Sequence, residues 1–193
     1  MSRIAVVYHS GYGHTKAQAE AVARGAAEVA GARVALIPVE ETEARAAEID
    51  QADAIVFGAP TYMGSLSAPM KAFMDASSKV WAEGRWKDKV AAGFTNSGSL
   101  SGDKLNSLVQ LAVFAAQHGM IWVNLDLPPG NHTSTGGPHE LNRLGSWLGA
   151  MAQSNTDEGP DKGPTASDLA TAEHLGRRVA KVARTLAGHT VAA

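Results

Sequence analysis

Short apolar segments alternate with longer amphipathic segments along the chain. The apolar segments are nearly continuous in aliphatic and β-branched residues, which is typical of strands that a sheet buries on both faces. They predict strands at residues 3–8, 33–39, 53–57, 89–95 and 120–125. Apolar residues at helical spacing predict helices at residues 16–30, 67–81, 103–118 and 165–186. This alternation predicts an open parallel α/β sheet that helices cover on both faces.

Two stretches are too polar for either kind of element. Residues 128–137 are rich in Pro, Gly, Asn, Ser and Thr, and residues 154–164 are similarly polar. We expect both to be surface loops, and we interpret Asp157-Glu158 as part of a solvated loop. The chain shows no repeat of about 20–50 residues and no linker between two cores, so residues 1–193 are expected to form one domain.

Charge and hydropathy exclude several classes of partner. Lys and Arg total 17 against 19 Asp and Glu, for a formal charge of −2. This balance lacks the basic surface that a nucleic acid or an acidic membrane attracts. No apolar run approaches the roughly 18 residues that span a bilayer, and the N-terminus lacks a signal-peptide pattern. We therefore expect a cytoplasmic protein with no nucleic-acid or membrane partner.

The chain contains no cysteine, so disulfides, thiolate nucleophiles and iron–sulfur clusters are excluded. Any redox chemistry must then come from a bound cofactor. A hydrolase is disfavoured because residues 98–102, Gly-Ser-Leu-Ser-Gly, place Leu where a G-x-S-x-G motif needs Ser. His132 and His139 lack the spacing of metal ligands, and we expect no metal site.

The loop after the first predicted strand has the chemistry of a phosphate site. Residues 10–15 offer two hydroxyls and a series of backbone N–H groups where a helix begins, and they contain no Lys or Arg. The spacing fits neither a Walker loop nor a dinucleotide fingerprint, since Lys16 stands where the fingerprint needs its third glycine. A monophosphate is the better fit.

Two further loops follow strands whose ends meet the same edge of the sheet. Residues 60–67 are too apolar for a solvent turn yet carry hydrogen-bonding groups, which suits contact with a flat heteroaromatic ring. Residues 96–102 are small, so that their backbone N–H groups could reach the polar edge of such a ring. In open α/β sheets ligands bind at this edge, where the strand order reverses.

With these motifs the chain resembles the flavodoxin-like FMN proteins and, within them, the WrbA-type NAD(P)H:quinone oxidoreductases. The similarity runs along most of the first 125 residues and is vaguer afterwards. The segments that carry it are residues 8–15, 57–61 with Gly64, 70–75, Ser97-Gly98 and 118–120. The resemblance implies a doubly wound, five-stranded parallel sheet of order 2-1-3-4-5.

The resemblance also implies FMN as cofactor, NADH or NADPH as co-substrate, and specific contacts. The residues implied around FMN are Ser10, Gly11, Tyr12, Gly13, His14 and Thr15 at the phosphate, and Pro60, Thr61, Tyr62, Met63, Gly64, Ser97, Gly98, Ser99, Leu100, Ser101 and Gly102 at the ring. His118 would lie near the flavin as an assisting residue. Trp81 and Tyr12 match residues of the substrate and nicotinamide sites. No catalytic acid or base is implied.

The chain departs from the family pattern in places, so we expect a divergent member. Tyr62 and Met63 stand where the family usually has Arg and an aromatic residue, and residues 147–150, Trp-Leu-Gly-Ala, replace its usual C-terminal signature. The implied function is transfer of two electrons from NAD(P)H through FMN to a quinone, in a dimer or tetramer. The alternatives are a one-electron carrier, which a charge of only −2 disfavours, and an FMN-binding interaction or regulatory protein without reductase activity.

Overall fold

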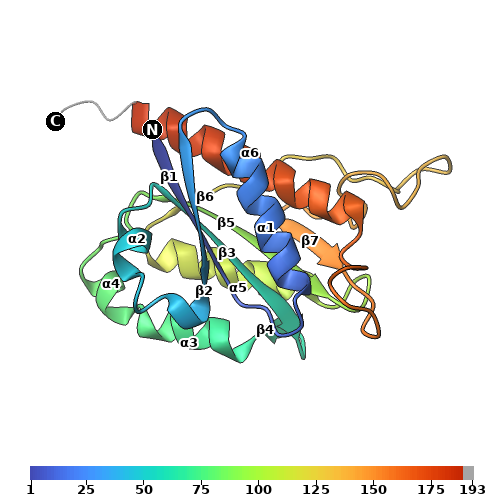
Figure 1. Cartoon of the computed structure of the whole chain (residues 1–193), viewed down its shortest axis with the longest axis horizontal. Coiled ribbons are helices and arrows are strands. Elements are labelled where there is room, and N and C mark those ends of the chain that lie inside the picture. The colour runs from blue at the N-terminus through green and yellow to red at the C-terminus, as the bar shows by residue number, and fades with distance from the viewer. Residues whose placement is uncertain (189–193) are drawn as a thin grey trace.

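A computed structural model describes residues 1–188 and shows a twisted sheet between two layers of helices (Figure 1). The strands are β1 (Ser2–Tyr8), β2 (Ala32–Pro38), β3 (Ala54–Tyr62), β4 (Ser65–Leu66), β5 (Val90–Ser97), β6 (Ile121–Trp122) and β7 (Ala150–Gln153). The main sheet runs in the order β2-β1-β3-β5-β6, and all of these neighbours pair in parallel. The two-residue strand β4 lies outside this order, so β5 and β6 are the fourth and fifth strands of the predicted order 2-1-3-4-5. The predicted fold class and strand order are therefore confirmed.

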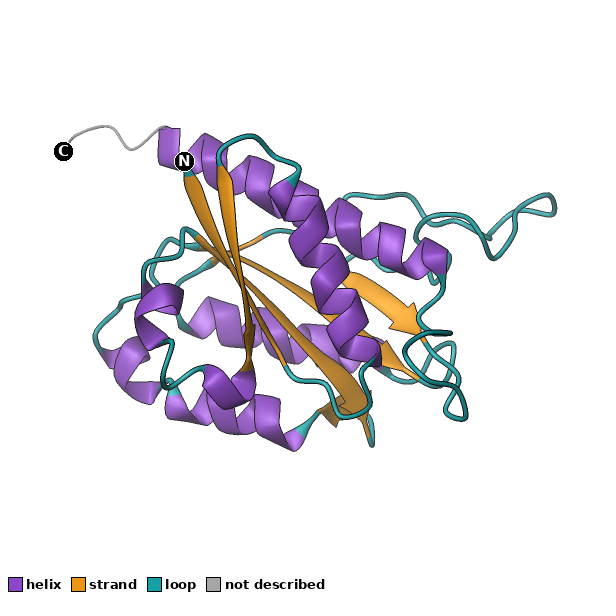
Figure 2. Ribbon diagram, in the orientation of Figure 1, coloured by secondary structure: helices purple, strands orange, loops and turns teal. Residues whose placement is uncertain are grey.

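Helices lie on both sides of the sheet (Figure 2). They are α1 (His14–Ala27), the 3₁₀ turn η1 (Val39–Glu41), α2 (Ala46–Asp50), α3 (Ala68–Ala76), α4 (Ser78–Ala82), α5 (Lys104–Gln117) and α6 (Ala166–Gly188). Successive β1 residues face opposite cores, since Val6 packs with α1 and α6 while Val7 packs with α3 and α5. Among the described residues, no helix is long and apolar enough to cross a membrane.

The fifth position of the sheet is filled by two short strands. β6 pairs with the start of β5, and β7 pairs with its end, from Phe94 to Ser97. Between them the chain turns away at Asp126, which has a positive φ of 50°. Residues 128–149 then form an excursion whose tip projects from the body at the right of Figure 1. The prediction of one continuous strand at residues 120–125 was therefore wrong in extent.

The third strand is longer than its apolar run. β3 continues through Pro60 and Thr61, and β4 folds back on it in antiparallel pairing. Met63 and Gly64 form the two-residue turn with φ of 48° and 77°, the conformation that joins tightly paired antiparallel strands. Residues 60–67, predicted as a loop, are therefore mostly a short hairpin. The helix predicted at residues 67–81 is likewise interrupted, because Ser77 separates α3 from α4.

The two helices on one face of the sheet, α1 and α6, cross in close contact. A Cβ atom at Gly25 of α1 would collide with the backbone oxygen of Glu173, and one at Gly176 of α6 would collide with that of Val22. Only glycine at these two positions lets the backbones approach so closely. This packing brings the N-terminal end of α6 and the preceding segment over the edge of the sheet where the parallel strands end, here called the carboxyl edge (Figure 1).

Candidate functional site

A cavity of about 570 Å³ opens at the carboxyl edge of the sheet. All three predicted loops contribute to its wall. The predicted residues that line it are Ser10, Tyr12, His14, Thr15, Pro60, Thr61, Tyr62, Ser97 and Gly98. A fourth segment, which the sequence pattern did not indicate, adds Ser154, Thr156, Glu158 and Gly159, and Asn96 completes the wall. The segment 154–159 is therefore part of a cavity wall as well as a surface loop, and Glu158 lies at the cavity.

The first loop presents unused donors at the start of α1. Ser10 Oγ accepts hydrogen bonds from the backbone N–H groups of Gly13 and Lys16, each at 3.1 Å. Four backbone N–H groups that immediately precede or begin α1, those of Gly11, Tyr12, His14 and Thr15, have no hydrogen-bond partner among the described residues. Gly13 turns the chain into the helix with φ of 90°. Free N–H groups at a helix N-terminus form an anion site.

The segment before α6, residues 154–160, packs directly on this loop and is here called the C-terminal segment. His14 Nε2 lies 2.9 Å from the backbone oxygen of Glu158, and Pro160 lies over Gly13, where a Cβ atom would be 2.8 Å from Pro160 Cγ. The Glu158 carboxylate in turn accepts a hydrogen bond of 2.9 Å from Asn155. Residues more than 140 positions apart in sequence thus form one wall.

Buried hydroxyls from β5 and α5 hold the side chain of Thr61, which lines the cavity at the end of β3. Thr61 Oγ1 lies 2.8 Å from Thr95 Oγ1 and 2.8 Å from Ser107 Oγ, and Thr95 donates to the backbone oxygen of Ala59 at 2.7 Å. Tyr12 and Tyr62 meet edge to face at the rim, with ring centres 6.4 Å apart. Burial raises the pKa of Tyr62, which is therefore neutral near pH 7. Two aromatic rings at a rim suit flat, partly apolar substrates.

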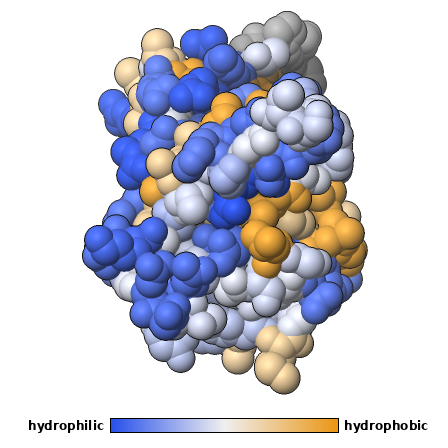
Figure 3. Space-filling view, turned by 90° about the vertical axis from the view of Figure 1, so that its right-hand side faces the viewer, coloured by the Kyte–Doolittle hydropathy of each residue, from blue (hydrophilic) through white to orange (hydrophobic). Residues whose placement is uncertain are grey.

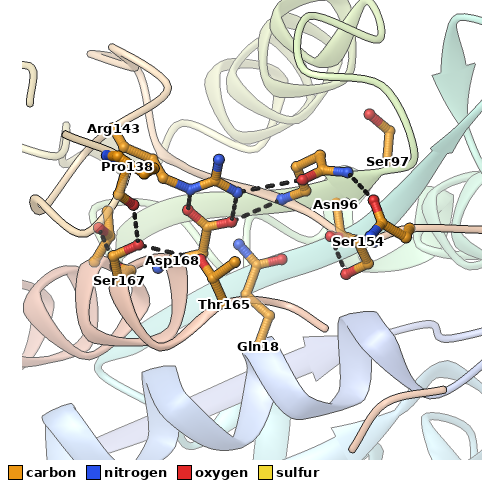
Figure 4. A network of polar contacts seen from close by, with 12 residues as sticks. Gln18, Asn96, Ser97, Pro138, Arg143, Ser154, Thr165, Ser167 and Asp168 are labelled. Atoms are coloured by element: carbon orange, nitrogen blue, oxygen red, sulfur yellow. Dashed lines mark hydrogen bonds and ion pairs between the residues drawn. The ribbon is translucent and has the colours of Figure 1, made fainter. Parts of the chain in front are cut away.

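A charged network ties β5 and β7 to α6 beside the cavity (Figure 4). Arg143 binds Asp168 through two hydrogen bonds of 2.8 and 2.7 Å, and the pair is almost fully buried. Asp168 also accepts the backbone N–H of Gln153, whose side chain donates to the backbone oxygen of Gly98 at 2.9 Å. Ser154 Oγ donates to Asn96 Oδ1 at 3.0 Å. The network fixes the end of β5 against the C-terminal segment.

Lys104, the first residue of α5, is fully buried behind this part of the cavity wall. Its ammonium donates to Ser97 Oγ at 2.8 Å and to the backbone oxygen of Ser99 at 2.6 Å. Burial lowers the pKa of Lys104 to about 8, although Asp168 acts in the opposite direction. Sequence reasoning missed the burial of Lys104 beside the cavity, because lysine side chains are rarely fully buried.

Several predicted contacts lie outside the cavity wall. Met63 is fully exposed at the tip of the hairpin, and Leu100 is also exposed. The predicted ring contacts that do not line the cavity are Met63, Gly64, Ser99, Leu100, Ser101 and Gly102. Gly11 and Gly13 also do not line the cavity, and they contribute to the site only through the backbone of residues 10–15.

His118 and Trp81 lie on a second cavity of about 610 Å³, which we call the helix cavity. It lies between α5 and the pair α3–α4. His118 caps the end of α5 opposite to Lys104, and the 14 residues of α5 separate these two ends by about 21 Å. Within one chain, His118 and Trp81 therefore do not reach the carboxyl-edge cavity, and the expectation that His118 lies near it is not met in the single chain.

The surroundings of His118 explain its protonation state. The side chain is buried, with Nε2 2.9 Å from Ser77 Oγ and its ring centre 4.5 Å from that of Trp86. Burial lowers the pKa of His118, so the ring is neutral near pH 7. Trp81 is 58% exposed.

Comparisons with known proteins agree with this site and fold. Residues 10–127 match the model of the family described as NADPH-dependent FMN reductase. The flavodoxin FldP of Pseudomonas aeruginosa (strain UCBPP-PA14) is 44% identical over 190 residues, which cover 96% of this chain and 99% of the relative. The NAD(P)H dehydrogenase (quinone) of Archaeoglobus fulgidus is 37% identical over 209 residues, which cover 96% of this chain and 100% of the relative.

A solved structure gives the same result. The crystal structure of the flavodoxin, WrbA-like protein from Agrobacterium tumefaciens superposes with a TM-score of 0.74 at 45% identity, covering 96% of this chain and 99% of that one. These relatives match nearly the whole chain, including the excursion and the C-terminal segment. The chain therefore belongs to the flavodoxin-like NADPH-dependent FMN reductase family, whose members work with FMN and a reduced nicotinamide nucleotide.

Proposed function

We propose that the protein binds FMN in the carboxyl-edge cavity and transfers two electrons from NADH or NADPH to a quinone-type acceptor. The observation that carries this proposal is the group of four free backbone N–H groups at the start of α1, next to a cavity of about 570 Å³. Small-molecule and cofactor sites commonly have volumes of roughly 300–1,000 Å³. Relatives named NAD(P)H dehydrogenase (quinone) support the activity.

The donors fit the phosphate of FMN. The free N–H groups of residues 11, 12, 14 and 15 would bind its oxygens, together with the hydroxyls of Ser10 and Thr15. No Lys or Arg lines the cavity among the described residues, so the helix N-terminus and these neutral donors would provide the attraction. The ring would then extend toward Thr61, Tyr62, Ser97 and Gly98.

Bound FMN would supply the hydride-accepting and hydride-donating chemistry of the reaction. The chain's own residues would bind and orient it. Thr61 is held by Thr95 and Ser107, and Gly98 is held by Gln153, so both sides of the ring would meet rigid groups. Tyr12 and Tyr62 at the rim would stack against the nicotinamide and the quinone in turn. We assign no side chain as a general acid or base.

Anaerobic stopped-flow measurements of the FMN-loaded protein test this function. NADH or NADPH is expected to bleach the flavin absorbance rapidly, and a benzoquinone is expected to restore it. Dithionite provides the control for a reducible flavin. If dithionite bleaches the flavin and neither nucleotide does so at a useful rate, the reductase function is wrong.

The flavodoxin name of the 44% identical relative supports a second candidate, a carrier of single electrons between proteins. Such carriers dock through strongly acidic surfaces, whereas this chain has a formal charge of −2. A stepwise reductive titration separates the two functions. A highly populated and long-lived one-electron-reduced flavin would favour the carrier, and direct conversion to the two-electron-reduced form favours the reductase.

We also propose that the protein is a homo-oligomer. Leu105, Val109 and Val113 form a stripe along α5, and all three side chains are exposed by 42–59%. Figure 3 likewise shows hydrophobic residues gathered on part of one face, beside hydrophilic surface. Val109 and Val113 also line the helix cavity, with Trp81 and His118. A second copy on this stripe would cover these residues, so the proposed roles of Trp81 and His118 depend on assembly.

A cytoplasmic location stays a prediction.

A further inference from the structure

Lys104 is a buried cation whose hydrogen-bond partners are both neutral. The side chain is fully buried, and its ammonium donates only to a hydroxyl, Ser97 Oγ, and a backbone oxygen, that of Ser99. Burial of an ammonium without a bound counter-ion is costly, and natural chains rarely retain one without a partner. The structure therefore holds a positive charge at this place that forms no ion pair with a carboxylate among the described residues.

The nearby charges do not neutralise Lys104. Asp168 is the acidic group that acts on it, but both oxygens of Asp168 are bound by Arg143, and one also accepts the N–H of Gln153. Arg143 and Asp168 cancel one another as a pair. Lys104 is therefore left as one uncompensated positive charge of this cluster, directly behind the cavity wall.

Ser97 connects this charge to the cavity. The Ser97 side chain accepts from Lys104, donates to the Ser99 backbone oxygen at 3.1 Å, and belongs to a residue that lines the cavity. One residue thus separates the ammonium from the end of the cavity where the proposed function puts the flavin ring. Attraction between the ammonium and a negative charge on the ring across such a short distance is stronger in this poorly solvated region than in water.

We propose that Lys104 is a positioning residue that, through Ser97, makes the cavity bind reduced flavin more tightly than it otherwise would. This inference rests on the proposed function. A hydride brings one proton and two electrons to the neutral ring, so the ring gains one negative charge while the nicotinamide leaves as NAD(P)⁺. A fixed positive charge beside the ring favours the anionic product over the neutral reactant, and so raises the reduction potential of the bound flavin.

Redox titration with dithionite tests this inference without using a nicotinamide nucleotide. The Kd of oxidised FMN and the two-electron potential together give the ratio of affinities for reduced and oxidised flavin. Lys104→Met and Lys104→Gln are expected to lower this ratio by about tenfold, equivalent to about 30 mV for a two-electron couple. Lys104→Arg keeps the charge and is expected to retain most of the ratio.

Lys89 provides a matched control. Its ammonium is also partly buried and donates to two backbone oxygens, those of Asp50 and Ala52, and burial lowers its pKa as well. It precedes β5, whereas Lys104 follows it, and the eight residues of this strand separate them by about 26 Å. Lys89→Met is therefore expected to leave the affinity ratio unchanged. The side chains of Lys104→Met and Lys104→Gln differ in shape. If one variant fails to fold, the affinity ratio of the other still tests the inference.

The pH dependence distinguishes charge from packing. Arg143 and Asp168 face Lys104, and the other titratable side chains at the cavity are Tyr12, His14, Tyr62 and Glu158. All of them are retained in Lys104→Met, so the difference between wild type and variant isolates Lys104. This difference is expected to be largest at neutral pH and to shrink when the lysine loses its proton in alkaline solution.

Three results would overturn the inference. They are an unchanged affinity ratio in Lys104→Met and Lys104→Gln, an equal loss in Lys104→Arg, and an equal loss in Lys89→Met. Failure of the proposed function would look different, because it would appear in the wild type as a flavin that dithionite reduces and NAD(P)H does not.

Discussion

Ser10 and Thr15 are the two residues whose hydroxyls belong to the proposed phosphate site. Ser10 Oγ holds the loop in shape through Gly13 and Lys16, and the Thr15 side chain is buried at the cavity. Replacing both by Ala is expected to weaken FMN binding by at least about tenfold, since hydrogen bonds to a charged group contribute roughly 1.5–3 kcal/mol each. Riboflavin, which lacks the phosphate, is expected to lose much less affinity.

Fluorescence titration of the apoprotein with each flavin measures these affinities. Ser78→Ala, an exposed serine away from the carboxyl-edge cavity, serves as the control. Equal losses for FMN and riboflavin would mean that the loop contacts something other than the phosphate.

Lys104 also gives a prediction about stability against pH. Its pKa falls from an ordinary 10.5 to about 8 in the folded protein, so between these values the unfolded chain binds more protons than the folded chain. The free energy of unfolding therefore rises with pH in this window. Between pH 7.5 and 10, the wild-type apoprotein is expected to gain about 2 kcal/mol relative to Lys104→Met.

Urea denaturation of both apoproteins at several pH values measures this gain. Taking the difference removes the titration of Tyr8 and Tyr62, whose pKa values are also raised by burial. A constant difference across the window would show that Lys104 keeps an ordinary pKa in the folded state.

At the scale of elements, the α1–α6 crossing depends on two glycines. Alanine normally stabilises a helix relative to glycine by about 1 kcal/mol. At Gly176, however, the added methyl group would meet the Val22 backbone oxygen, so the helices must separate. Overpacking of this kind costs about 1–3 kcal/mol, so Gly176→Ala is expected to lower the free energy of unfolding.

Thermal and urea denaturation measure this change. Gly137→Ala is the matched control, since a Cβ atom there meets nothing within 4 Å. A Gly176→Ala protein that is more stable than wild type would show that helix propensity outweighs the close contact.

Elements could be predicted from the sequence where one pattern determines them. β1 and β5 are nearly continuous apolar runs that the fold buries along most of their length, and β2 packs against both cores. Their predicted bounds differ from the observed ones by at most two residues. β7 has only four residues, of which two are alanine, and such a segment has no distinctive periodicity. Its place in the sheet depends on pairing with β5, which only the folded chain shows.

At the scale of the whole molecule, topology located most of the cavity but not all of it. The three loops follow strands that end at one edge, so their meeting could be expected from the strand order. Residues 154–159 carry only the composition of a solvated loop, and their position depends on α6 packing against α1. Lys104 was missed for a similar reason, since its burial depends on the fold of residues 97–102 around its ammonium.

Assembly is the property of the whole molecule that connects the two cavities. The stripe of Leu105, Val109 and Val113 borders the helix cavity that holds Trp81 and His118. A second copy that buries this stripe would also cover that cavity. Wild-type protein is therefore expected to have a molar mass in light scattering that is a multiple of the 20.0 kDa chain.

Val113→Glu tests this assembly by placing a charge in the apolar stripe. It is expected to shift the protein toward the monomer and to lower quinone reduction, because burial of an unpaired carboxylate is unfavourable. FMN affinity is expected to stay unchanged, since Val113 lies outside the carboxyl-edge cavity. Lys181→Glu, which adds negative charge to the exposed side of α6, is expected to change none of these properties. A wild type that is monomeric and fully active with quinones would show that one chain suffices, and that Trp81 and His118 take no part in the reaction.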